Sequence, residues 1–143
     1  MDLIGWSQNL THETAKAAGV ILVSKHELFE RADILTIHLV LSSRTRGLVG
    51  AGQLERMKPT AWLVNASRGP IVDEQALISV LKNKRIAGAA IDVFDTEPLP
   101  PSHPFRTLDN VLATPHIGYV SDGLYRTFYE DTVSNIRQWL DTQ

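Results

Sequence analysis

The chain has 143 residues, of which 43% are hydrophobic and 21% are charged, and its net charge is −2. This length and composition suit one globular domain with its own core, and the charge offers no electrostatic footprint for nucleic acid or an anionic membrane. The absence of cysteine excludes disulfides, thiolate metal ligands and a cysteine nucleophile. No apolar run approaches the roughly 20 residues of a membrane span, and the first residues lack the features of a signal peptide, so we expect a cytoplasmic protein.

Short apolar runs alternate with helical patterns along the first 60 residues. Ser24 is a candidate helix cap, because Glu27 three residues later completes a capping box. Pro59 is expected to end the helix that precedes it. The pattern predicts strands over 3–6, 20–23 and 34–39, and helices over 11–18, 24–32 and 51–58.

The same alternation continues to the end of the chain. Strands are expected over 61–65, 88–91 and 111–113, and Asp73 is expected to cap a helix between the first two. That helix has an apolar stripe of Ala76, Leu77, Val80 and Leu81. A last helix is expected to bury Leu124, Phe128, Ile136 and Leu140.

The apolar strands are continuous rather than alternating, which is typical of strands buried on both faces. Strands of this kind separated by helices predict an α/β fold, with a parallel sheet covered by helices on both faces. The loop over 95–109 carries four prolines and is expected to cross the molecule as a rigid, extended segment. No repeat or linker divides the chain, so residues 1–143 are treated as one domain.

Four polar side chains stand at or just after predicted strand ends: Arg68, Asp92, Glu97 and His116. In an open parallel sheet, ligands bind outside the carboxyl ends of the strands, so these residues can converge on one crevice. Arginine can hold a carboxylate with two parallel hydrogen bonds. A histidine oriented by a carboxylate can exchange a proton near neutral pH. This set suits redox chemistry at a 2-hydroxy acid.

Each of these residues also has an ordinary structural interpretation. Arg68 could be a solvated loop residue, Glu97 a surface residue and His116 a satisfied loop histidine, while Asp92 could cap a turn. Their occurrence together and in order favours a site. For the other histidines, we expect His38 to be structural or part of a pocket wall, and we expect surface positions for His12, His26 and His103.

The motifs around these residues resemble those of the D-isomer-specific 2-hydroxyacid dehydrogenases, and the resemblance covers essentially the whole chain. The segments that carry it are 32–39 (ADILTIHL), 45–49 (TRGLV), 65–69 (NASRG), 72–77 (VDEQAL), 88–94 (GAAIDVF), 97–99 (EPL) and 110–118 (NVLATPHIG).

The resemblance implies a Rossmann-like fold, a nicotinamide cofactor (NAD or NADP) and a small 2-keto or 2-hydroxy acid as substrate. It implies that Arg68 binds the substrate carboxylate and keto oxygen, that His116 exchanges the proton, and that Glu97 pairs with His116. It also implies contacts with the cofactor. Asp92 would hold the nicotinamide carboxamide, and His38 and Leu39 would line the adenine and ribose pocket. The nicotinamide would be bordered by Ala66, Ser67, Arg68, His116 and Gly118.

Three departures from the family pattern matter. The sequence has no Gly-x-Gly-x-x-Gly, and residues 3–7 resemble the family's second strand, so the first strand, the glycine-rich loop and the first helix are absent, as is the substrate domain. Ser7, Gln8 and Asn9 stand where the family pattern has an acidic residue that hydrogen-bonds the ribose 2′-hydroxyl of the cofactor. In the family's strand order the first strand is central, so its absence should leave two half-sheets with open, hydrophobic edges.

These departures predict an incomplete Rossmann-like domain that is catalytically inert or nearly so by itself, and that self-associates through its open edges. A non-enzymatic alternative is a nucleotide-sensing interaction module like the corepressors of the same family. A degenerate, non-functional piece is a third interpretation.

Overall fold

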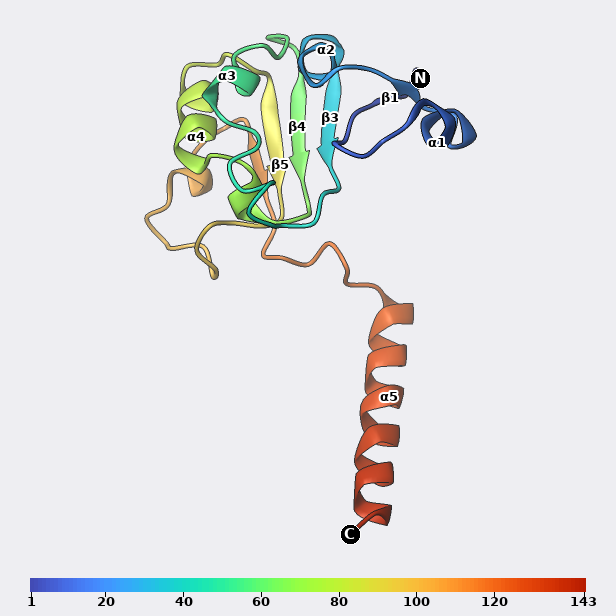
Figure 1. Cartoon of the computed structure of the whole chain (residues 1–143). Helices are drawn as coiled ribbons and strands as arrows, with labels where there is room; N and C mark the ends of the chain where they lie inside the picture. The colour runs from blue at the N-terminus through green and yellow to red at the C-terminus, as the bar shows by residue number, and fades with distance from the viewer.

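The computed structural model describes all 143 residues and confirms a parallel α/β architecture of the Rossmann type (Figure 1). Its strands are β1 (Ile4–Gly5), β2 (Ile21–Leu22), β3 (Ile34–Ile37), β4 (Trp62–Asn65), β5 (Gly88–Ile91) and β6 (Val111–Ala113). Its α-helices are α1 (His12–Ala17), α2 (Lys25–Arg31), α3 (Ala51–Leu54), α4 (Glu74–Lys82) and α5 (Asp122–Asp141), and the 3-10 helices are η1 (Gly69–Ile71) and η2 (Pro104–Arg106).

The caps predicted from the sequence start two of these helices, but the capping box expected at Glu27 is incomplete, and the Glu27 carboxylate accepts from Arg31 instead. Ser24 Oγ accepts the backbone N–H of Glu27 at the start of α2, and Asp73 Oδ1 accepts that of Ala76 at the start of α4. Each bond satisfies one of the backbone donors that a helix start leaves without a partner. The helix expected over 51–58 is shorter, because α3 ends at Leu54 and turns follow it.

The main sheet has the order β3-β4-β5-β6, and every neighbouring pair is parallel. The register aligns Ile37 with Asn65, Asn65 with Ile91, and Ile91 with Ala113. The four strands therefore reach their carboxyl ends in one row. The polar loop residues that follow these strands are brought to the same edge of the sheet.

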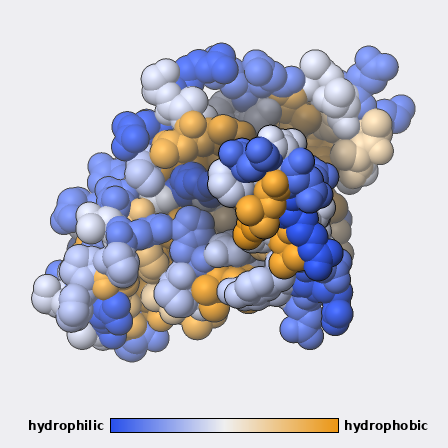
Figure 2. Space-filling view, turned by 90° about the horizontal axis from the view of Figure 1, so that it is seen from below, coloured by the Kyte–Doolittle hydropathy of each residue, from blue (hydrophilic) through white to orange (hydrophobic).

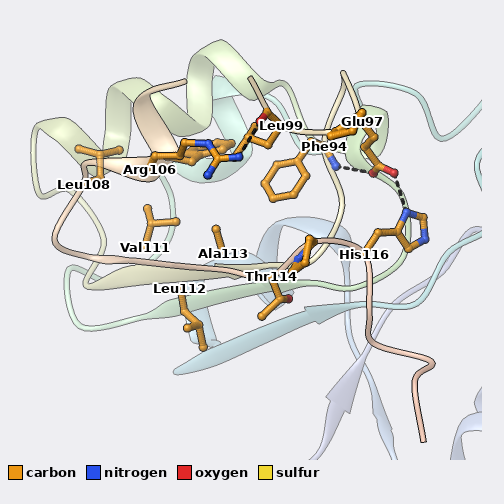
Figure 3. Close-up of a pocket in the computed structure, with 13 residues that line it drawn as sticks. Phe94, Glu97, Leu99, Arg106, Leu108, Val111, Leu112, Ala113, Thr114 and His116 are labelled. Carbon is orange, nitrogen blue, oxygen red and sulfur yellow. Dashed lines mark hydrogen bonds and ion pairs between the residues drawn. The ribbon is translucent and has the colours of Figure 1, made fainter. Parts of the chain in front are cut away.

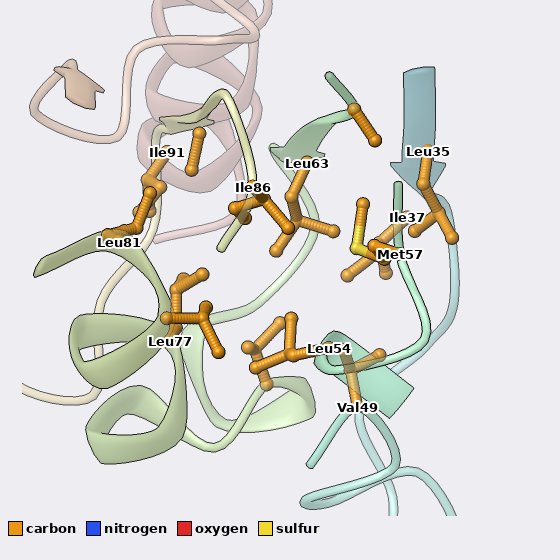
Figure 4. Close-up of a cluster of buried hydrophobic side chains, with 14 of the residues drawn as sticks. Leu35, Ile37, Val49, Leu54, Met57, Leu63, Leu77, Leu81, Ile86 and Ile91 are labelled. Carbon is orange, nitrogen blue, oxygen red and sulfur yellow. The ribbon is translucent and has the colours of Figure 1, made fainter. Parts of the chain in front are cut away.

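One face of this sheet packs on α3 and α4 and forms the core (Figure 4). Leu63 of the sheet, Leu54 of α3 and Leu81 of α4 are almost completely buried, as is Ile86 before β5. Burying an aliphatic side chain of this size stabilises the fold by about 1.5–3 kcal/mol. This cluster fixes the sheet on which the polar loops stand.

The opposite face of the same sheet has no helix layer. Ile34, Trp62 and Leu112 are 64%, 41% and 63% exposed, and β3 alternates between exposed and buried residues. The parallel α/β fold is confirmed, whereas helical cover is found on one face only. The continuous apolar runs arise because these strands are hydrophobic on both faces of the sheet. Helices of this chain cover only one of the two faces.

The strands do not form one continuous sheet. β1 and β2 pair in parallel with each other and are separate from the four-stranded sheet. The expected division into two half-sheets is confirmed. Lys25 helps to join the two parts, because its Nζ donates to the carbonyl of Leu48 at 3.0 Å and lies 5.8 Å from the centre of the Trp6 ring.

Helix α5 extends away from the sheet (Figure 1), and hydrophobic side chains are exposed on the face seen from below (Figure 2). The prediction of a buried face on α5 is therefore wrong. Leu124, Phe128, Ile136 and Leu140 are between 40% and 58% exposed. Their spacing does place apolar side chains on one side of the helix, but no other element of the chain packs there. None of the helices, α5 included, has both the length and the apolar composition needed to cross a membrane.

Candidate active site

The predicted site residues lie in loops that leave the carboxyl ends of the main sheet. His38 and Leu39 follow β3, Arg68 follows β4, Asp92 and Glu97 follow β5, and His116 follows β6. The aligned register of the strands brings these loops to one edge, which is where ligands bind in open parallel sheets.

His116 and Glu97 form a close imidazole–carboxylate pair at this edge (Figure 3). His116 Nδ1 lies 2.6 Å from Glu97 Oε2, and both side chains are about one-third exposed. The backbone of His116 has a φ of 57°, in the left-handed region that few non-glycine residues occupy. Backbone strain of this kind concentrates at functional sites. The conformation turns an imidazole with an oriented ring toward solvent.

Glu97 is held at both carboxylate oxygens. Its Oε1 accepts the backbone N–H of Phe94 at 2.9 Å, while Oε2 contacts His116. Burial by itself raises the pKa of Glu97, but the hydrogen bonds from His116 and Phe94 and the positive charges of His116 and Arg68 outweigh it and hold that pKa below its ordinary value. Glu97 therefore remains a carboxylate at neutral pH and fixes the ring of His116.

Asp92 organises the loop that carries His116. Its Oδ1 accepts the hydroxyl of Thr114 at 2.5 Å and the N–H of Ile117 at 2.8 Å, and Oδ2 accepts the N–H of Gly118 at 2.7 Å. Burial raises the pKa of Asp92, but these three hydrogen bonds and the nearby charge of His116 lower it further than burial raises it. Asp92 therefore does cap a turn, as its structural interpretation expected, and that turn is the one that follows His116.

The loop after β4 is fixed by Asn65, which is buried. Asn65 Nδ2 donates to the carbonyl of Arg68 at 3.0 Å, and Asn65 Oδ1 accepts the N–H of Ser67 at 3.1 Å. Ser67 Oγ in turn donates to the carbonyl of Leu39 at 2.5 Å. The guanidinium of Arg68 donates to the carbonyl of Ser67 at 2.6 Å and is exposed. Arg68 therefore presents a cation to solvent from a rigid loop.

The structure brings the predicted residues together in two groups. Glu97 contacts His116, Asp92 contacts Gly118 two residues further along the same loop, and a Cβ on Gly118 would lie 3.7 Å from Cβ of Ala66. Leu39 joins Ser67 on the β3 side. His38 is exposed, its Nε2 lies 3.0 Å from the hydroxyl of Thr36, and its side chain forms no hydrogen bond with the other site residues.

A cavity of about 820 Å³ begins at His116 and Glu97 and runs along β6 (Figure 3). Its walls are mainly apolar, and Arg106 lies toward the far end. Arg68 is not among the lining residues. The space beside the His116–Glu97 pair is therefore apolar on one side.

Sequence reasoning missed several participants. Thr114 binds Asp92, and the backbone N–H of Phe94 binds Glu97. The expectation that His103 is a surface residue is wrong, since its side chain is only 12% exposed and its Nε2 lies 3.1 Å from Glu74 Oε1. The acidic pair Asp73-Glu74 at a helix start was a usable signal for Glu74, whereas the contact with His103 spans 29 residues and has no local signature.

These residues fit the nicotinamide end of a dinucleotide. Three of the roughly four lone-pair positions of Asp92 are used, so one remains for an amide donor. Ala66 and Gly118 are exposed beside it and have no bulky side chain. No set of three or more His, Asp or Glu side chains in the structure could hold a metal ion.

The family described as D-isomer specific 2-hydroxyacid dehydrogenase, NAD binding domain, matches residues 1–118. A glyoxylate reductase of Thermofilum pendens is 51% identical over 90 residues, which are 63% of this chain and 26% of that protein. A D-3-phosphoglycerate dehydrogenase of Methanocaldococcus jannaschii is 44% identical over 119 residues, which are 82% of this chain and 22% of that protein. The chain thus spans about a quarter of the length of these curated relatives.

Solved structures agree with this assignment. A phosphoglycerate oxidoreductase from Vibrio cholerae superimposes with a TM-score of 0.91 at 34% identity, covering 100% of this chain and 46% of that one. The D-isomer specific 2-hydroxyacid dehydrogenase of Xanthobacter autotrophicus, in complex with NADPH, has a TM-score of 0.74 at 38% identity over 81% of this chain and 37% of that one. The enzyme of Lactobacillus delbrueckii, in its NAD complexed form, has a TM-score of 0.72 at 28% identity over 84% of this chain and 40% of that one. The chain therefore belongs to the D-isomer-specific 2-hydroxyacid dehydrogenase family, through the NAD-binding domain.

Proposed function

We propose that this chain carries the proton-transfer half of an active site that interconverts a D-2-hydroxy acid and a 2-keto acid with NAD or NADP. The observation that carries the proposal is the 2.6 Å contact between His116 Nδ1 and Glu97 Oε2. A carboxylate at Nδ1 fixes which ring nitrogen holds the proton and orients the other nitrogen toward a substrate.

In this proposal Nε2 of His116 exchanges a proton with the oxygen on the reacting carbon. The nicotinamide, when bound, supplies or accepts a hydride at the same carbon. Arg68 binds the substrate carboxylate with its planar fork of donors, since it is exposed and its charge has no acidic partner within ion-pair distance. Asp92, Ala66 and Gly118 border the nicotinamide, and Leu39 and His38 line the part of the crevice beside β3.

We also propose that residues 1–143 form a partial dinucleotide-binding domain whose own turnover is negligible. The sequence contains no Gly-x-Gly-x-x-Gly to seat a pyrophosphate on a helix start. The two half-sheets also lie apart where a continuous Rossmann-like sheet would join them. The side chains that act on the proton are present, whereas the phosphate site that places the cofactor is not.

The test is a titration of the ¹⁵N-labelled chain with NADH, with NADPH and then with glyoxylate, followed by NMR. We expect weak, millimolar binding, with shifts at Gly118, Ala66 and Asp92 for the cofactor and at the side chains of Arg68 and His116 for the keto acid. Oxidation of the reduced cofactor, followed by absorbance, is expected to stay near the uncatalysed rate. Shifts confined to other surfaces would contradict the assigned site, and turnover at ordinary enzyme rates would contradict the partial-domain proposal.

Self-association is the second part of the proposal. The free edges of β1 and β3 are open to pairing. In addition, α5 displays a stripe of exposed apolar side chains: Tyr125, Phe128, Tyr129, Ile136, Trp139 and Leu140. A 20-residue helix is 30 Å long, enough for two copies to pair along much of its length.

The charges of α5 favour an antiparallel pair. Arg126, Glu130, Arg137 and Asp141 follow one flank of the helix, because their spacing is close to whole turns. An antiparallel two-fold pairing can place Arg126 opposite Asp141 and Arg137 opposite Glu130 at the same time. None of these four side chains forms an ion pair within the chain, so all four are available to a second copy.

A further inference from the structure

The peptide that joins Phe94 to Asp95 lies between the loop of Arg68 and the carboxylate of Glu97. Its surroundings involve Gly69 and Glu74, which have no place in the chemistry described so far. Each of these residues contacts the Phe94–Asp95 peptide directly. The peptide is therefore held by two residues other than Glu97.

Gly69 makes the first of these contacts. It follows Arg68 directly and is buried, and its backbone packs against the carbonyl of Phe94. A Cβ at this position would lie 2.8 Å from the backbone N of Asp95 and closer still to the carbonyl group of Phe94. Real Cβ atoms do not approach backbone atoms so closely, so only glycine allows the Arg68 loop and the Glu97 loop to touch here.

Glu74 makes the second contact. Its Oε2 accepts the N–H of Asp95 at 3.4 Å, and its Oε1 lies 3.1 Å from His103 Nε2. His103 Nδ1 accepts the N–H of Phe105 at 3.2 Å, so the ring proton is on Nε2 and is donated to Glu74. The side chains of Glu74 and His103 are 17% and 12% exposed. Glu74 is thus anchored while it holds Asp95.

The placement of Glu74 is electrostatically unfavourable for its neighbour. Burial and the negative charges of Glu74 and Asp73 raise the pKa of Asp95, against the positive charge of Arg46. Glu74 therefore accepts a hydrogen bond from the backbone N–H of Asp95 and at the same time repels the Asp95 carboxylate. The favourable interaction between Glu74 and this segment is thus the backbone hydrogen bond and not an attraction between charges.

The preceding N–H, that of Phe94 itself, belongs to the Val93–Phe94 peptide and is joined to the held peptide through the Cα of Phe94. The backbone N–H of Phe94 donates to Glu97 Oε1 at 2.9 Å, and the other oxygen of Glu97 contacts His116. A rotation of the Phe94–Asp95 segment would remove the donor from Oε1 and release the carboxylate from its present orientation. Figure 3 shows this sequence of contacts from Phe94 through Glu97 to His116.

We propose that Gly69 and Glu74 are positioning residues: they fix the Phe94–Asp95 peptide, and through it the orientation of Glu97 toward His116. This inference rests on the proposed function only where the orientation of Glu97 toward His116 is taken to serve catalysis. The contact sequence itself is a property of this chain and can be measured without cofactor or substrate.

The test compares Glu74→Ala with Glu13→Ala by NMR on the whole chain. Glu13 stands in the first turn of α1 as Glu74 does in that of α4, so the control removes the same charge from the first turn of another helix. We expect Glu74→Ala to move the pKa of Glu97 up toward its ordinary value, measured by ¹³C titration of the carboxyl group. We also expect loss of the hydrogen-bonded Nδ1–H signal of His116, with neither change in Glu13→Ala.

Glu74→Gln is the second variant and preserves the size of the side chain. The two groups that face Glu74 are both donors, and an amide has only one acceptor oxygen. We therefore expect Gln to reproduce a large part of the effect of Ala, which a role in packing alone would not produce.

Two results would overturn the inference. One is a Glu74→Ala variant in which the Asp95 amide exchanges faster while the Glu97 titration and the His116 signal stay as in the wild type. The other is an equal change in the two Ala variants, which would reduce the role of Glu74 to a general charge effect. A failure of the proposed function would appear instead as absent NADH and glyoxylate shifts, with these NMR results unaffected.

Discussion

His116 and Glu97 join two loops that are 19 residues apart, with Nδ1 of the imidazole 2.6 Å from Oε2 of the carboxylate. One loop follows β6 and the other follows β5, so the pair bridges neighbouring strands of the sheet. Because the loops are fixed separately by Asp92 and by the Phe94 N–H, the geometry of the pair is set before any ligand binds.

Removal of the carboxylate from this pair should release the ring of His116. In Glu97→Ala we expect the proton of His116 to lose its preference for Nδ1, since nothing else accepts it there. Long-range ¹H–¹⁵N spectra distinguish the two ring tautomers. His103 is the internal control, because its Nδ1 accepts the N–H of Phe105 and its proton is on Nε2. An unchanged Nδ1–H signal for His116 would contradict the orienting role of Glu97.

The carboxylate of Asp92 should stabilise the fold, and the effect should depend on pH. Asp92→Asn replaces an acceptor of three hydrogen bonds with a group that has one acceptor oxygen, so we expect the free energy of unfolding at pH 7 to fall by about 3 kcal/mol. Denaturant unfolding measures this change. Asp109→Asn, at an exposed ion pair with Lys84, should change stability by less than about 0.5 kcal/mol.

The sign of the pH dependence follows from the folded-state pKa values. Those of Asp92 and Glu97 lie below their ordinary values of 3.8 and 4.5. Their stabilisation is therefore complete above those ordinary values and is lost as the pH falls through the lower folded values. Unfolding midpoints measured from pH 6 downward should decline less steeply in Asp92→Asn than in the wild type, and parallel declines would contradict this account.

Asp95 should behave in the opposite way. Burial and the charge of Glu74 raise its pKa above 3.8, so its ionisation destabilises the fold as the pH rises from the ordinary value through the raised one. Asp95→Asn should increase the stability at pH 7 and leave it nearly unchanged at pH 3. A loss of stability at pH 7 would show that the carboxylate makes a favourable interaction.

The close approach at Gly69 should make this position intolerant of any side chain. Gly69→Ala places a methyl group against the backbone of Phe94, and we expect a loss of more than about 3 kcal/mol, or failure to fold. Gly52→Ala is the matched control, because a Cβ there meets nothing within 4 Å and lies in α3. The control should gain up to about 1 kcal/mol from helix propensity. Similar stabilities of the two variants would contradict the packing at Gly69.

Self-association through α5 should depend on its apolar stripe. The double substitution Phe128→Lys and Ile136→Lys should convert an associated species into a monomer in sedimentation velocity, whereas Ser134→Lys on the polar side should not. Reversal of one flank charge, Arg137→Glu, should weaken association, and Arg137→Glu combined with Glu130→Arg should restore it. A monomeric wild-type chain would contradict the helix pair, and association that survives the double substitution would assign it to the open strand edges.

Much of the fold follows from local patterns in the sequence. The parallel strands and the caps at Ser24 and Asp73 are found as expected, and they depend on hydrophobic runs and on hydrogen bonds between residues three positions apart. The separation of β1 and β2 from the main sheet is also found, but it is expected from the strand order of the resembled family rather than from a local pattern. The pairing of Glu97 with His116, implied by the family resemblance, is also present.

The errors concern partners that the pattern does not identify. The spacing in α5 shows that one side of the helix is apolar, but it does not show what packs against that side, and nothing in this chain does. Likewise, β3 has apolar residues on both sides, of which one is covered. The contact of His103 with Glu74 depends on how a long loop meets a helix start, which local sequence cannot indicate.

The division of the sheet has a consequence for local stability. The first 23 residues make their main contacts among themselves, and the buried Ala15 and Val23 are not members of the 20-residue core. Amides of β1 and β2 should therefore exchange through a partial opening of low free energy, while those of β4 and β5 exchange only on global unfolding. A dinucleotide that bridged both parts would close the N-terminal unit as it bound, so its affinity would include the free energy of that closure.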